Sequence, residues 1–557
     1  MLRPRSAILV GVALVVMLAL SLCLQNAPVW DDADLTVRNP YLASFGGFLR
    51  LWTADMWMTS AKEEPSSFYR PVAMASYAIG RAVFGNAPAG YHLVNLVLHG
   101  VNAALVGLLA LRLGRVGMVS AAACALGFGL APLNVEAVTW LAGRFDLLGT
   151  TLLLAALLVN GATGRARYGV VPLLIAALLS KEAFITGGAL VAASDLLFHG
   201  RRARDEAPKW AAIVLLVALV FVVRRVVGVM SVAAFAATPI PSLLSSVAFL
   251  VMTFGRQLLW PAYLDPFRHY AAPSVPVVVV TLAACAALFF ACVLAVRARP
   301  DDARRRLLLA GVGWAFLTLG PVSVTGPNLE MVGDRYAYLP LVGVFFAVAA
   351  MLDAAASVRP RAAVVVAFVA APVLFAWTLR DRARLAEWRD ERALFVASVR
   401  DDPQNFYSVY SLGQLDAVQG RFPEAEANLL HAEELRPGYW RSENALCFVW
   451  LNTGRFAEAE RACLSSVEHM PGNPRAWINL VSVYVRAGKW ARCLEVVPSA
   501  IAHRPRGAEP VYLRAVCRAN AGDLAGAASD VRAALAFEPS HAGANDLARQ
   551  LKSRGAM

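Results

Sequence analysis

Residues 275–296 read VPVVVVTLAACAALFFACVLAV, a run without a single charged side chain. A helix needs about 20 apolar residues to cross the hydrocarbon core of a bilayer, so this run predicts a transmembrane helix. Similar runs recur from Val10 to Ala376 and then stop. Hydrophobic residues make up 58% of the 557-residue chain and charged residues only 16%, which is far from the composition of soluble domains. The sequence therefore predicts an all-α, polytopic membrane domain over residues 1–380.

Clusters of basic residues between the apolar runs predict which loops are cytoplasmic. They are Arg3/Arg5, Arg112/Arg115, Arg165/Arg167, Arg201/Arg202/Arg204, Arg297 to Arg306 and Arg359/Arg361. If all six are cytoplasmic, an even number of crossings separates each cluster from the next. Eleven spans meet this condition, at 7–24, 91–111, 117–132, 147–161, 168–181, 184–199, 210–229, 275–296, 306–322, 337–354 and 362–379. The N-terminus is then cytoplasmic and the C-terminus extracytoplasmic, and the net charge of +13 needs no nucleic-acid partner to explain it.

Two apolar stretches need a separate interpretation. Leu243 to Trp260 would place the Arg297 cluster on the wrong side if it crossed the membrane, so we interpret it as a re-entrant or interfacial helix. Met1 to Leu24 has the basic start and apolar core of a signal peptide, but no small-x-small cleavage site precedes Gln25. We therefore favour a retained first span.

The loops that this topology places outside hold nearly all the polar residues with chemical character. Carboxylates and arginines at a membrane boundary are costly unless they are paired or used, so each group is a functional candidate. Taken singly, each is more often a loop charge or an anchor; taken together on one face, they favour an active site at the outer surface. The groups are Trp30-Asp31-Asp32 with Asp34, Phe68-Tyr69-Arg70-Pro71, Glu136 with Arg144 and Asp146, Ser180-Lys181-Glu182, Arg256 with Asp265, and Glu330 with Asp334-Arg335-Tyr336.

A strict period of 34 residues begins after the membrane domain. It is kept by Pro403, Pro437, Pro471, Pro505 and Pro539, by Gly420, Gly454, Gly488 and Gly522, by Ala425, Ala459, Cys493 and Ala527, and by Ala432, Ser466, Ala500 and Ala534. A 34-residue helix-turn-helix with small residues where the helices cross is typical of tetratricopeptide repeats. Gly permits the turn and Pro ends the preceding helix. We predict a connecting helix at 381–402, amphipathic from Leu385 to Arg400, and a repeat domain at 403–557, with four repeats and a capping helix from Gly543 to Lys552.

Four of the eight cysteines lie in the repeat domain. Cys447 and Cys463 are placed symmetrically about one turn, and Cys493 and Cys517 about another, so two disulfides could form outside the cytoplasm. However, Cys493 occupies a column otherwise filled by Ala, and Cys463 a column of Leu and Val. We favour buried packing of these side chains, with the two bridges as the alternative. Cys23, Cys124, Cys285 and Cys292 lie in predicted spans as small buried residues.

Several short motifs occur in a characteristic order. They are Trp30-Asp31-Asp32, Tyr69-Arg70-Pro71, His92-Leu93-Val94-Asn95 with His99, Glu136-Ala137-Val138, Gly143-Arg144-Phe145-Asp146, Leu179-Ser180-Lys181-Glu182 and Asp334-Arg335-Tyr336. In this order and followed by the repeats, the chain resembles the transmembrane and tetratricopeptide-repeat O-mannosyltransferases, as a bacterial-type member. It departs from them at Ala131-Pro132, where the family typically has His-Pro, and this puts the preference for donor or acceptor in doubt.

The resemblance implies a C-type glycosyltransferase fold and protein O-mannosylation. Such enzymes move a sugar, here expected to be mannose, from a polyprenyl-phosphate carrier to an extracytoplasmic protein or glycan. The carboxylates Asp31 and Asp32 are then the candidate bases for the acceptor hydroxyl, and the repeats would present the acceptor. Guanidinium groups suit the departing phosphate, and we rank Arg335 and Arg144 first. The other expected donor-binding residues are Arg70, Lys181, Glu136, Asp146, Glu182, Asp334 and Tyr69.

No cofactor is expected. No compact His/Asp/Glu set suggests a metal, although a divalent ion bridging Asp31 and Asp32 to the phosphate remains an alternative, and His92, Asn95 and His99 form one helix stripe that suits interhelical hydrogen bonds better. No Walker loop or dinucleotide motif is present, which argues against nucleotide-driven transport. The rivals to the enzyme are a non-catalytic scaffold whose repeats recruit envelope proteins and a transporter of a lipid-linked sugar. The Ala-, Arg- and Val-rich composition suggests a GC-rich bacterium, hence an inner-membrane protein with periplasmic repeats.

Overall fold

The computed structural model of the chain describes residues 4–61, 66, 68–229, 238–324, 331–358, 360–504 and 507–557, with backbone only at 4–5 and 360–367. Of the residues singled out above, Arg3, Glu330, Arg359 and Pro505 lie outside this set. The chain forms two compact units, Met1–Leu394 and Phe395–Met557, and the division falls inside the predicted connecting segment 381–402. Both units are helical, and the only strands in the described residues are the antiparallel pair β1 (Arg268–His269) and β2 (Met331–Val332).

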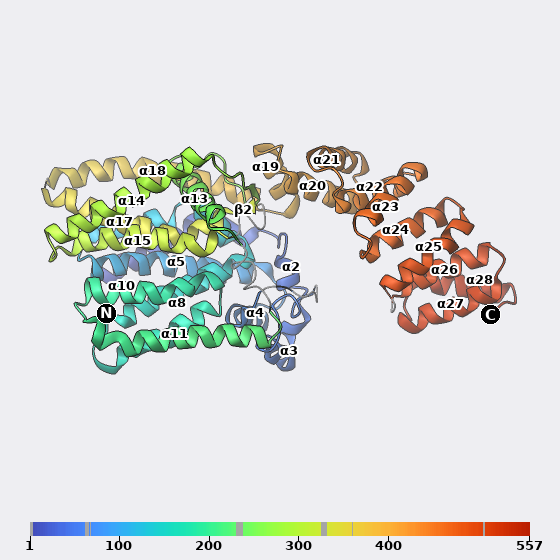
Figure 1. Cartoon of the computed structure of the whole chain (residues 1–557), viewed down its shortest axis with the longest axis horizontal. Coiled ribbons are helices and arrows are strands. Elements are labelled where there is room, and N and C mark those ends of the chain that lie inside the picture. Colours follow the sequence, from blue (N-terminus) through green and yellow to red (C-terminus); the bar gives the residue numbers. More distant parts are fainter. Residues whose placement is uncertain are drawn as a thin grey trace. The chain divides into compact units, whose positions relative to one another are not determined.

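The first unit is a bundle of long helices with short helical turns between them (Figure 1). Its helices are α1 (Pro4–Leu20), α2 (Asp32–Leu35), α3 (Phe45–Arg50), α4 (Pro71–Phe84), α5 (Pro88–Leu113), α6 (Met118–Gly129), α7 (Val135–Thr139), α8 (Arg144–Asn160), α9 (Val170–Leu178), α10 (Gly187–Phe198), α11 (Ala203–Val226), α13 (Ile240–Leu259), α14 (Val275–Ala298), α15 (Ala303–Val322), α17 (Tyr338–Val358) and α18 (Pro360–Glu387). Helix α1 contributes Leu9, Val16 and Leu20 to the core of the bundle. The chain is a multi-pass membrane protein.

Seven helices of the described residues are long and apolar enough to cross a membrane, or eight if the bent pair formed by α6 and the segment Pro132–Thr139 is one span. Six of the seven fall on predicted spans. The predicted spans 168–181 and 184–199 are instead the short helices α9 and α10, because the backbone leaves the α-helix around Lys181 and turns through a 3-10 helix at Glu182–Thr186. The break itself was predicted, since one span was expected to end at Lys181 and the next to begin at Phe184, but hydropathy did not show that each of the two helices is too short to cross a bilayer alone.

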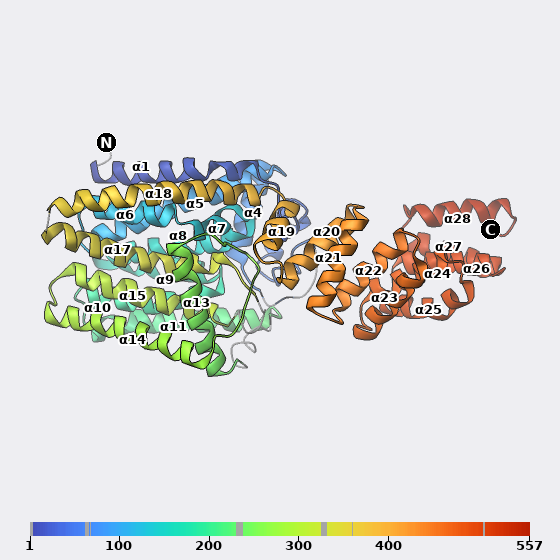
Figure 2. The ribbon, with the colours of Figure 1, turned by 90° about the horizontal axis from the view of Figure 1, so that it is seen from above.

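The seventh helix that meets the length and composition criteria is α13, which we interpreted as re-entrant or interfacial. Figure 2 shows α13 running across the direction of α11, α14 and α15. One side of α13, with Leu250, Phe254 and Gln257 at helical spacing, is buried, whereas Leu259 and Trp260 at its end are exposed. Length therefore allows α13 to span a membrane, while its direction and its one buried face suit a helix that lies along a surface.

The predicted continuous helix from Leu385 to Arg400 is wrong. Helix α18 ends at Glu387, and α19 (Glu391–Asp401) begins after a break of three residues. The Oδ1 of Asp390 accepts a hydrogen bond from the backbone N–H of Ala393 at 2.8 Å. Because an aspartate at this position satisfies the free N–H groups of a helix start, it favours a new helix over continuation of the old one.

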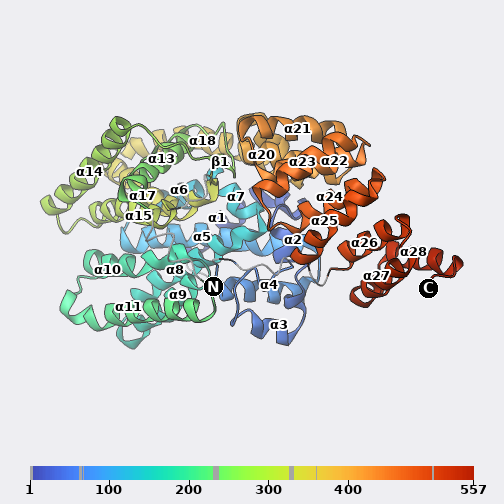
Figure 3. The ribbon, with the colours of Figure 1, turned by 45° about the vertical axis from the view of Figure 1, so that its right-hand side comes forward.

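The second unit is an α-solenoid of helix pairs, as the 34-residue period predicts (Figure 3). Its helices are α20 (Phe406–Val418), α21 (Phe422–Leu435), α22 (Trp440–Asn452), α23 (Phe456–His469), α24 (Pro474–Arg486), α25 (Trp490–His503), α26 (Ala508–Asn520), α27 (Leu524–Phe537) and the final α28 (Ala542–Ser553). The four periodic glycines all have positive φ, from 68° to 93°, as a tight turn inside each pair requires. The eight small residues of the two other columns are all fully buried where the helices cross.

The four cysteines of the repeats form disulfides, in contrast to the buried packing that we favoured. Cys447 pairs with Cys463 between α22 and α23, and Cys493 pairs with Cys517 between α25 and α26. The Cα–Cα distances are 5.3 and 6.2 Å, within the range that a disulfide spans. A cysteine at a repeat position that is otherwise small or apolar can still form a disulfide, because the neighbouring antiparallel helix places a second cysteine opposite it.

Candidate functional site

The sequence-predicted site residues come from loops and helix ends at one end of the first unit. Figure 1 shows α2, α4 and β2 at this end, and the chain's N-terminus at the other end of the bundle. The connecting segments bring together residues that are far apart in the sequence, from the first loop to the turn before α17.

Asp32 is fully buried and its carboxylate is held by the backbone. Its Oδ2 accepts hydrogen bonds from the N–H groups of Val29 and Leu141, both at 3.2 Å, and its Oδ1 accepts one from Ala142 at 3.0 Å. Burial raises the pKa of Asp32 to about 8, and the three N–H donors oppose this rise. These contacts tie the first loop to the segment before α8, so Asp32 positions the loop and has no open path to a substrate.

Asp31 lies beside it and is partly exposed. The preceding residue, Trp30, has a φ of 54°, which is uncommon for a residue with a side chain and costs conformational energy. The surrounding structure holds this conformation: Trp30 stacks on Trp140 with ring centroids 5.2 Å apart and meets Phe267 edge-on at 5.0 Å. The strained turn at Trp30 thus fixes the direction of Asp31.

Arg335 sits within an aromatic group and is paired with Glu136. Its guanidinium lies 4.7 Å from the ring centres of Trp140 and Tyr336 and 5.7 Å from that of Trp30. It forms an ion pair with Glu136, and its backbone N–H also donates to Glu136 at 3.2 Å. Gly333 leaves room for this ion pair, because a Cβ there would lie 2.2 Å from the Nη1 of Arg335 and would displace it. Through its contact with Trp30, Arg335 therefore lies beside the loop that carries Asp31 and Asp32.

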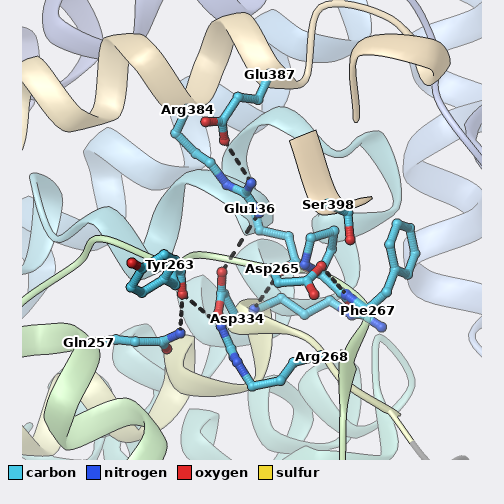
Figure 4. Close-up of polar contacts among 12 residues, drawn as sticks. Glu136, Gln257, Tyr263, Asp265, Phe267, Arg268, Asp334, Arg384, Glu387 and Ser398 are labelled. Atoms are coloured by element: carbon cyan, nitrogen blue, oxygen red, sulfur yellow. Dashed lines mark hydrogen bonds and ion pairs between the residues drawn. The ribbon is translucent and has the colours of Figure 1, made fainter. Parts of the chain in front are cut away.

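Asp334 belongs to a second ionic group, which faces the end of α18 (Figure 4). The Nη1 of Arg268 donates to Asp334 at 3.0 Å, and Arg384 lies 3.8 Å from its other oxygen. Arg384 in turn donates to Glu387 at 2.8 Å. Asp334 and Arg384 are almost completely buried, so the predicted donor-binding role of Asp334 is less direct than a role in positioning Arg335.

Three further ion pairs lie at the ends of α4, α8 and α11. Lys181 contacts both oxygens of Asp146 at 2.7 Å and lies 5.3 Å from the ring centre of Tyr336. Glu182 forms ion pairs with two arginines, with Arg70 at 2.9 Å and with Arg224 at 2.8 Å. Although burial raises the pKa of Glu182, Arg70 and Arg224 lower it more, to about 2. Two guanidinium groups share one carboxylate here, so this triad carries an excess positive charge.

Arg144 and Tyr69 are placed differently from the roles expected for them. Arg144 is fully buried; its donors reach the Oδ1 of Asn95 at 2.9 Å and the carbonyl of Tyr91 at 2.7 Å, and its plane covers Tyr77. These partners leave it no access to a phosphate, so the geometry favours a structural role over the high rank that we gave it. The hydroxyl of Tyr69 donates to the carbonyl of Trp52 at 2.8 Å, which anchors the loop before α4.

The contacts join these groups into one network. Asp32 reaches the segment of Trp140, Trp140 contacts Trp30 and Arg335, and Tyr336 next to Arg335 meets Lys181. The plane of Arg70 lies 4.7 Å from the ring centre of Phe145, next to Asp146. Sequence reasoning missed the partners Arg224, Arg268 and Arg384. Arg224 gave the only signal, as an arginine deep in an apolar run.

Comparison with known proteins supplies a family context. The curated relatives of the chain are protein O-mannosyl-transferases, which confirms the resemblance seen in the motifs. One from Caenorhabditis elegans is 27% identical over 435 residues, covering 75% of this chain and 61% of that protein. Human TMTC4 is 24% identical over 457 residues, covering 70% of this chain and 61% of that protein. The chain thus spans about three fifths of the length of these relatives.

No protein-family model matches the chain. Among solved structures, the tetratricopeptide-repeat protein YrrB is 16% identical with a TM-score of 0.26, covering 32% of this chain and 89% of that protein. A score this low supports no conclusion about this chain.

Proposed function

We propose that this chain is a membrane glycosyltransferase that moves a sugar, mannose in the first instance, from a polyprenyl-phosphate carrier to an extracytoplasmic protein or glycan. The observation that carries this proposal is the single network at one end of the bundle, in which the strained loop that bears the partly exposed Asp31 meets Arg335 through Trp30, and Arg335 lies beside Tyr336, which also meets Lys181. The names of the curated relatives support the same reaction class.

Asp31 is the base in this proposal. The acceptor hydroxyl attacks the anomeric carbon of the sugar while the bond from that carbon to the phosphate oxygen breaks, and the hydroxyl proton passes to the carboxylate of Asp31. The products are an inverted glycoside and the free polyprenyl phosphate. Asp32 is a positioning residue, because its oxygens are occupied by three backbone N–H groups.

The phosphate of the carrier binds at the triad of Arg70, Glu182 and Arg224. This group has one more cation than it has carboxylates, so it can accept an anion without losing its internal pairs. Arg335 and Lys181 are each paired with one carboxylate, Glu136 and Asp146 respectively. Both cations lie beside the ring of Tyr336 and add to the positive charge of the site. Planar guanidinium groups contact two phosphate oxygens at once, which suits a leaving group whose charge grows.

No cofactor takes part in this proposal. Arginines, rather than a divalent ion, neutralise the charge of the phosphate in this proposal. A chelator such as EDTA is therefore expected to leave transfer unchanged. The repeats present the acceptor, since stacked helix pairs form extended concave surfaces. The N-terminus lies in the cytoplasm, and the repeats lie outside a plasma or inner membrane.

The test is transfer of labelled mannose from a polyprenyl-phosphate donor into extracytoplasmic protein, in membranes that contain the full chain. Replacing the base, Asp31→Asn, is expected to lower transfer on the order of a hundredfold or more. The matched control is Asp34→Asn in the same loop, whose carboxylate pairs with Arg38 at 3.7 Å. Equal transfer in both variants would remove Asp31 from the mechanism. No transfer by the wild type would favour the non-catalytic scaffold.

A further inference from the structure

An apolar cavity of about 320 Å³ lies inside the bundle, away from the network described above. It lies between α15 and three helices that pack around α15, namely α10, α14 and α17. Leu307, Trp314 and Phe346 line its buried side, whereas Phe289 and Leu317 on its walls are more than one third exposed. The cavity therefore opens towards the outer surface of the bundle, which in a membrane is in contact with lipid.

Water does not suit this cavity. A buried water molecule needs two to four polar partners. The only lining side chains with polar atoms are Ser194, whose hydroxyl has no partner among the described residues, and Trp314, whose N–H already donates to the carbonyl of Leu339 at 2.8 Å. A hydrocarbon chain is the occupant that this lining favours.

One end of the cavity lies beside a group of arginines. Leu113 and Leu307, which both line it, directly follow Arg112 and Arg306 in the sequence. A Cβ on Gly114 would lie 2.4 Å from the Cδ2 of Leu307, so the end of α5 touches the start of α15, and Arg112 and Arg306 belong to these two helix ends. This end is opposite the first loop.

Three of these arginines are not matched by carboxylates. Arg304 pairs with Asp302 and Asp353, and Arg305 pairs with Asp302. In the described part of the chain, no carboxylate lies within ion-pair distance of Arg112, Arg115 or Arg306. The buried Nε of Arg306 has no hydrogen-bond partner there either. An anionic group is thus favoured at the end of an apolar cavity.

We propose that the cavity holds one acyl chain of an anionic glycerophospholipid, whose phosphate contacts Arg112, Arg115 and Arg306. The lipid fills the space between α10 and α15 and joins the two sides of the bundle. This site differs from the proposed donor site in its position and in its ligand, and it does not depend on the proposed function.

The experiment is equilibrium binding of phosphatidylglycerol to the delipidated full-length protein, measured by native mass spectrometry in detergent. The wild type is expected to bind one molecule and to prefer it over phosphatidylcholine with the same chains. Arg112→Gln/Arg115→Gln is expected to bind about thirtyfold more weakly. Arg297→Gln, an exposed arginine near the end of α14 that does not line the cavity, is the matched control.

A second variant tests the cavity itself. At Gly313 a Cβ would make only ordinary contact with Phe289, at 3.6 Å, so Gly313→Leu fills the cavity and is expected to abolish specific binding. Gly320→Leu, on the same helix with nothing within 4 Å, is expected to bind like the wild type. Binding that Gly313→Leu leaves intact would overturn the proposal. So would equal binding of phosphatidylcholine, or displacement of phosphatidylglycerol by polyprenyl phosphate.

Discussion

Asp31 and Asp32 are adjacent in the sequence, yet the structure gives them different environments. Asp32 is enclosed by backbone N–H groups, whereas Asp31 is partly exposed beside the strained residue Trp30. The sequence presents both as equivalent candidate bases, because a dipeptide of two aspartates contains no information about which oxygen meets a backbone loop 110 residues later. Their separation of roles is a property of the folded loop.

The raised pKa of Asp32 predicts a dependence of stability on pH. Its pKa is about 8 in the folded chain against 3.8 for an ordinary aspartate, so the folded state binds the proton more tightly. This contribution to the free energy of unfolding is fully present below about pH 4 and is lost as pH rises through about 8. The temperature at the midpoint of unfolding should therefore decrease as the pH is raised from about 4 to about 8, and level off above that. Asp32→Asn should remove most of this fall, and an unchanged fall in the variant would contradict the prediction.

Arg224 offers a test of the proposed phosphate site. Removing its charge, Arg224→Gln, takes away one of the two cations on Glu182 and with it the excess positive charge. A charged hydrogen bond contributes about 1.5–3 kcal/mol, so kcat/KM for the lipid donor should fall roughly tenfold to a hundredfold. Arg225→Gln, the exposed neighbour on the same helix, should leave the kinetics unchanged. Equal effects of the two variants would exclude a phosphate site at this triad.

At the scale of elements, the repeats could be predicted almost completely and the membrane domain only in outline. The glycine and small-residue columns of the repeats report the backbone directly, because the turn requires positive φ and the crossing requires a short side chain. In the membrane domain, by contrast, hydropathy locates the break near Lys181 but does not show how short the helices on either side of it are. The candidate site shows the same limit: the loops could be predicted, but the pairing of Glu182 with Arg224 arises only when α11 packs.

The turn between β2 and α17 shows how an element holds a catalytic side chain. Gly333 has a φ of −87°, so alanine would fit its backbone. The added Cβ, however, would lie 2.2 Å from Arg335 and 2.8 Å from Glu136 and would push this ion pair apart. Gly333→Ala should therefore lower transfer on the order of a hundredfold without loss of protein. Gly320→Ala, where space is open, should have no effect, and similar activity of both variants would refute the role of the turn.

For the whole molecule, the two disulfides and the order of the helices both indicate on which side of the membrane the repeats lie. Disulfides persist in oxidising compartments, so the pairs Cys447–Cys463 and Cys493–Cys517 favour repeats outside the cytoplasm. Three long helices, α15, α17 and α18, separate Arg299 from the repeats. If each crosses the membrane once, Arg299 and the repeats lie on opposite sides.

Whether the number of crossings between Arg299 and the repeats is odd or even can be measured by adding one cysteine at a time to the full chain. Arg549→Cys and Arg299→Cys each place a thiol at an exposed position, one in α28 and one between α14 and α15. In intact cells freed of any outer barrier, a membrane-impermeant maleimide should label Arg549→Cys at once and Arg299→Cys only after permeabilisation. The disulfide-bonded cysteines should react only after reduction, and reduction should lower stability by about 2–4 kcal/mol for each bridge. Labelling of both new thiols from outside would mean an even number of crossings between them. It would then show that one of the three helices does not span, and it would place both the arginine cluster and the repeats on the side of the proposed active site.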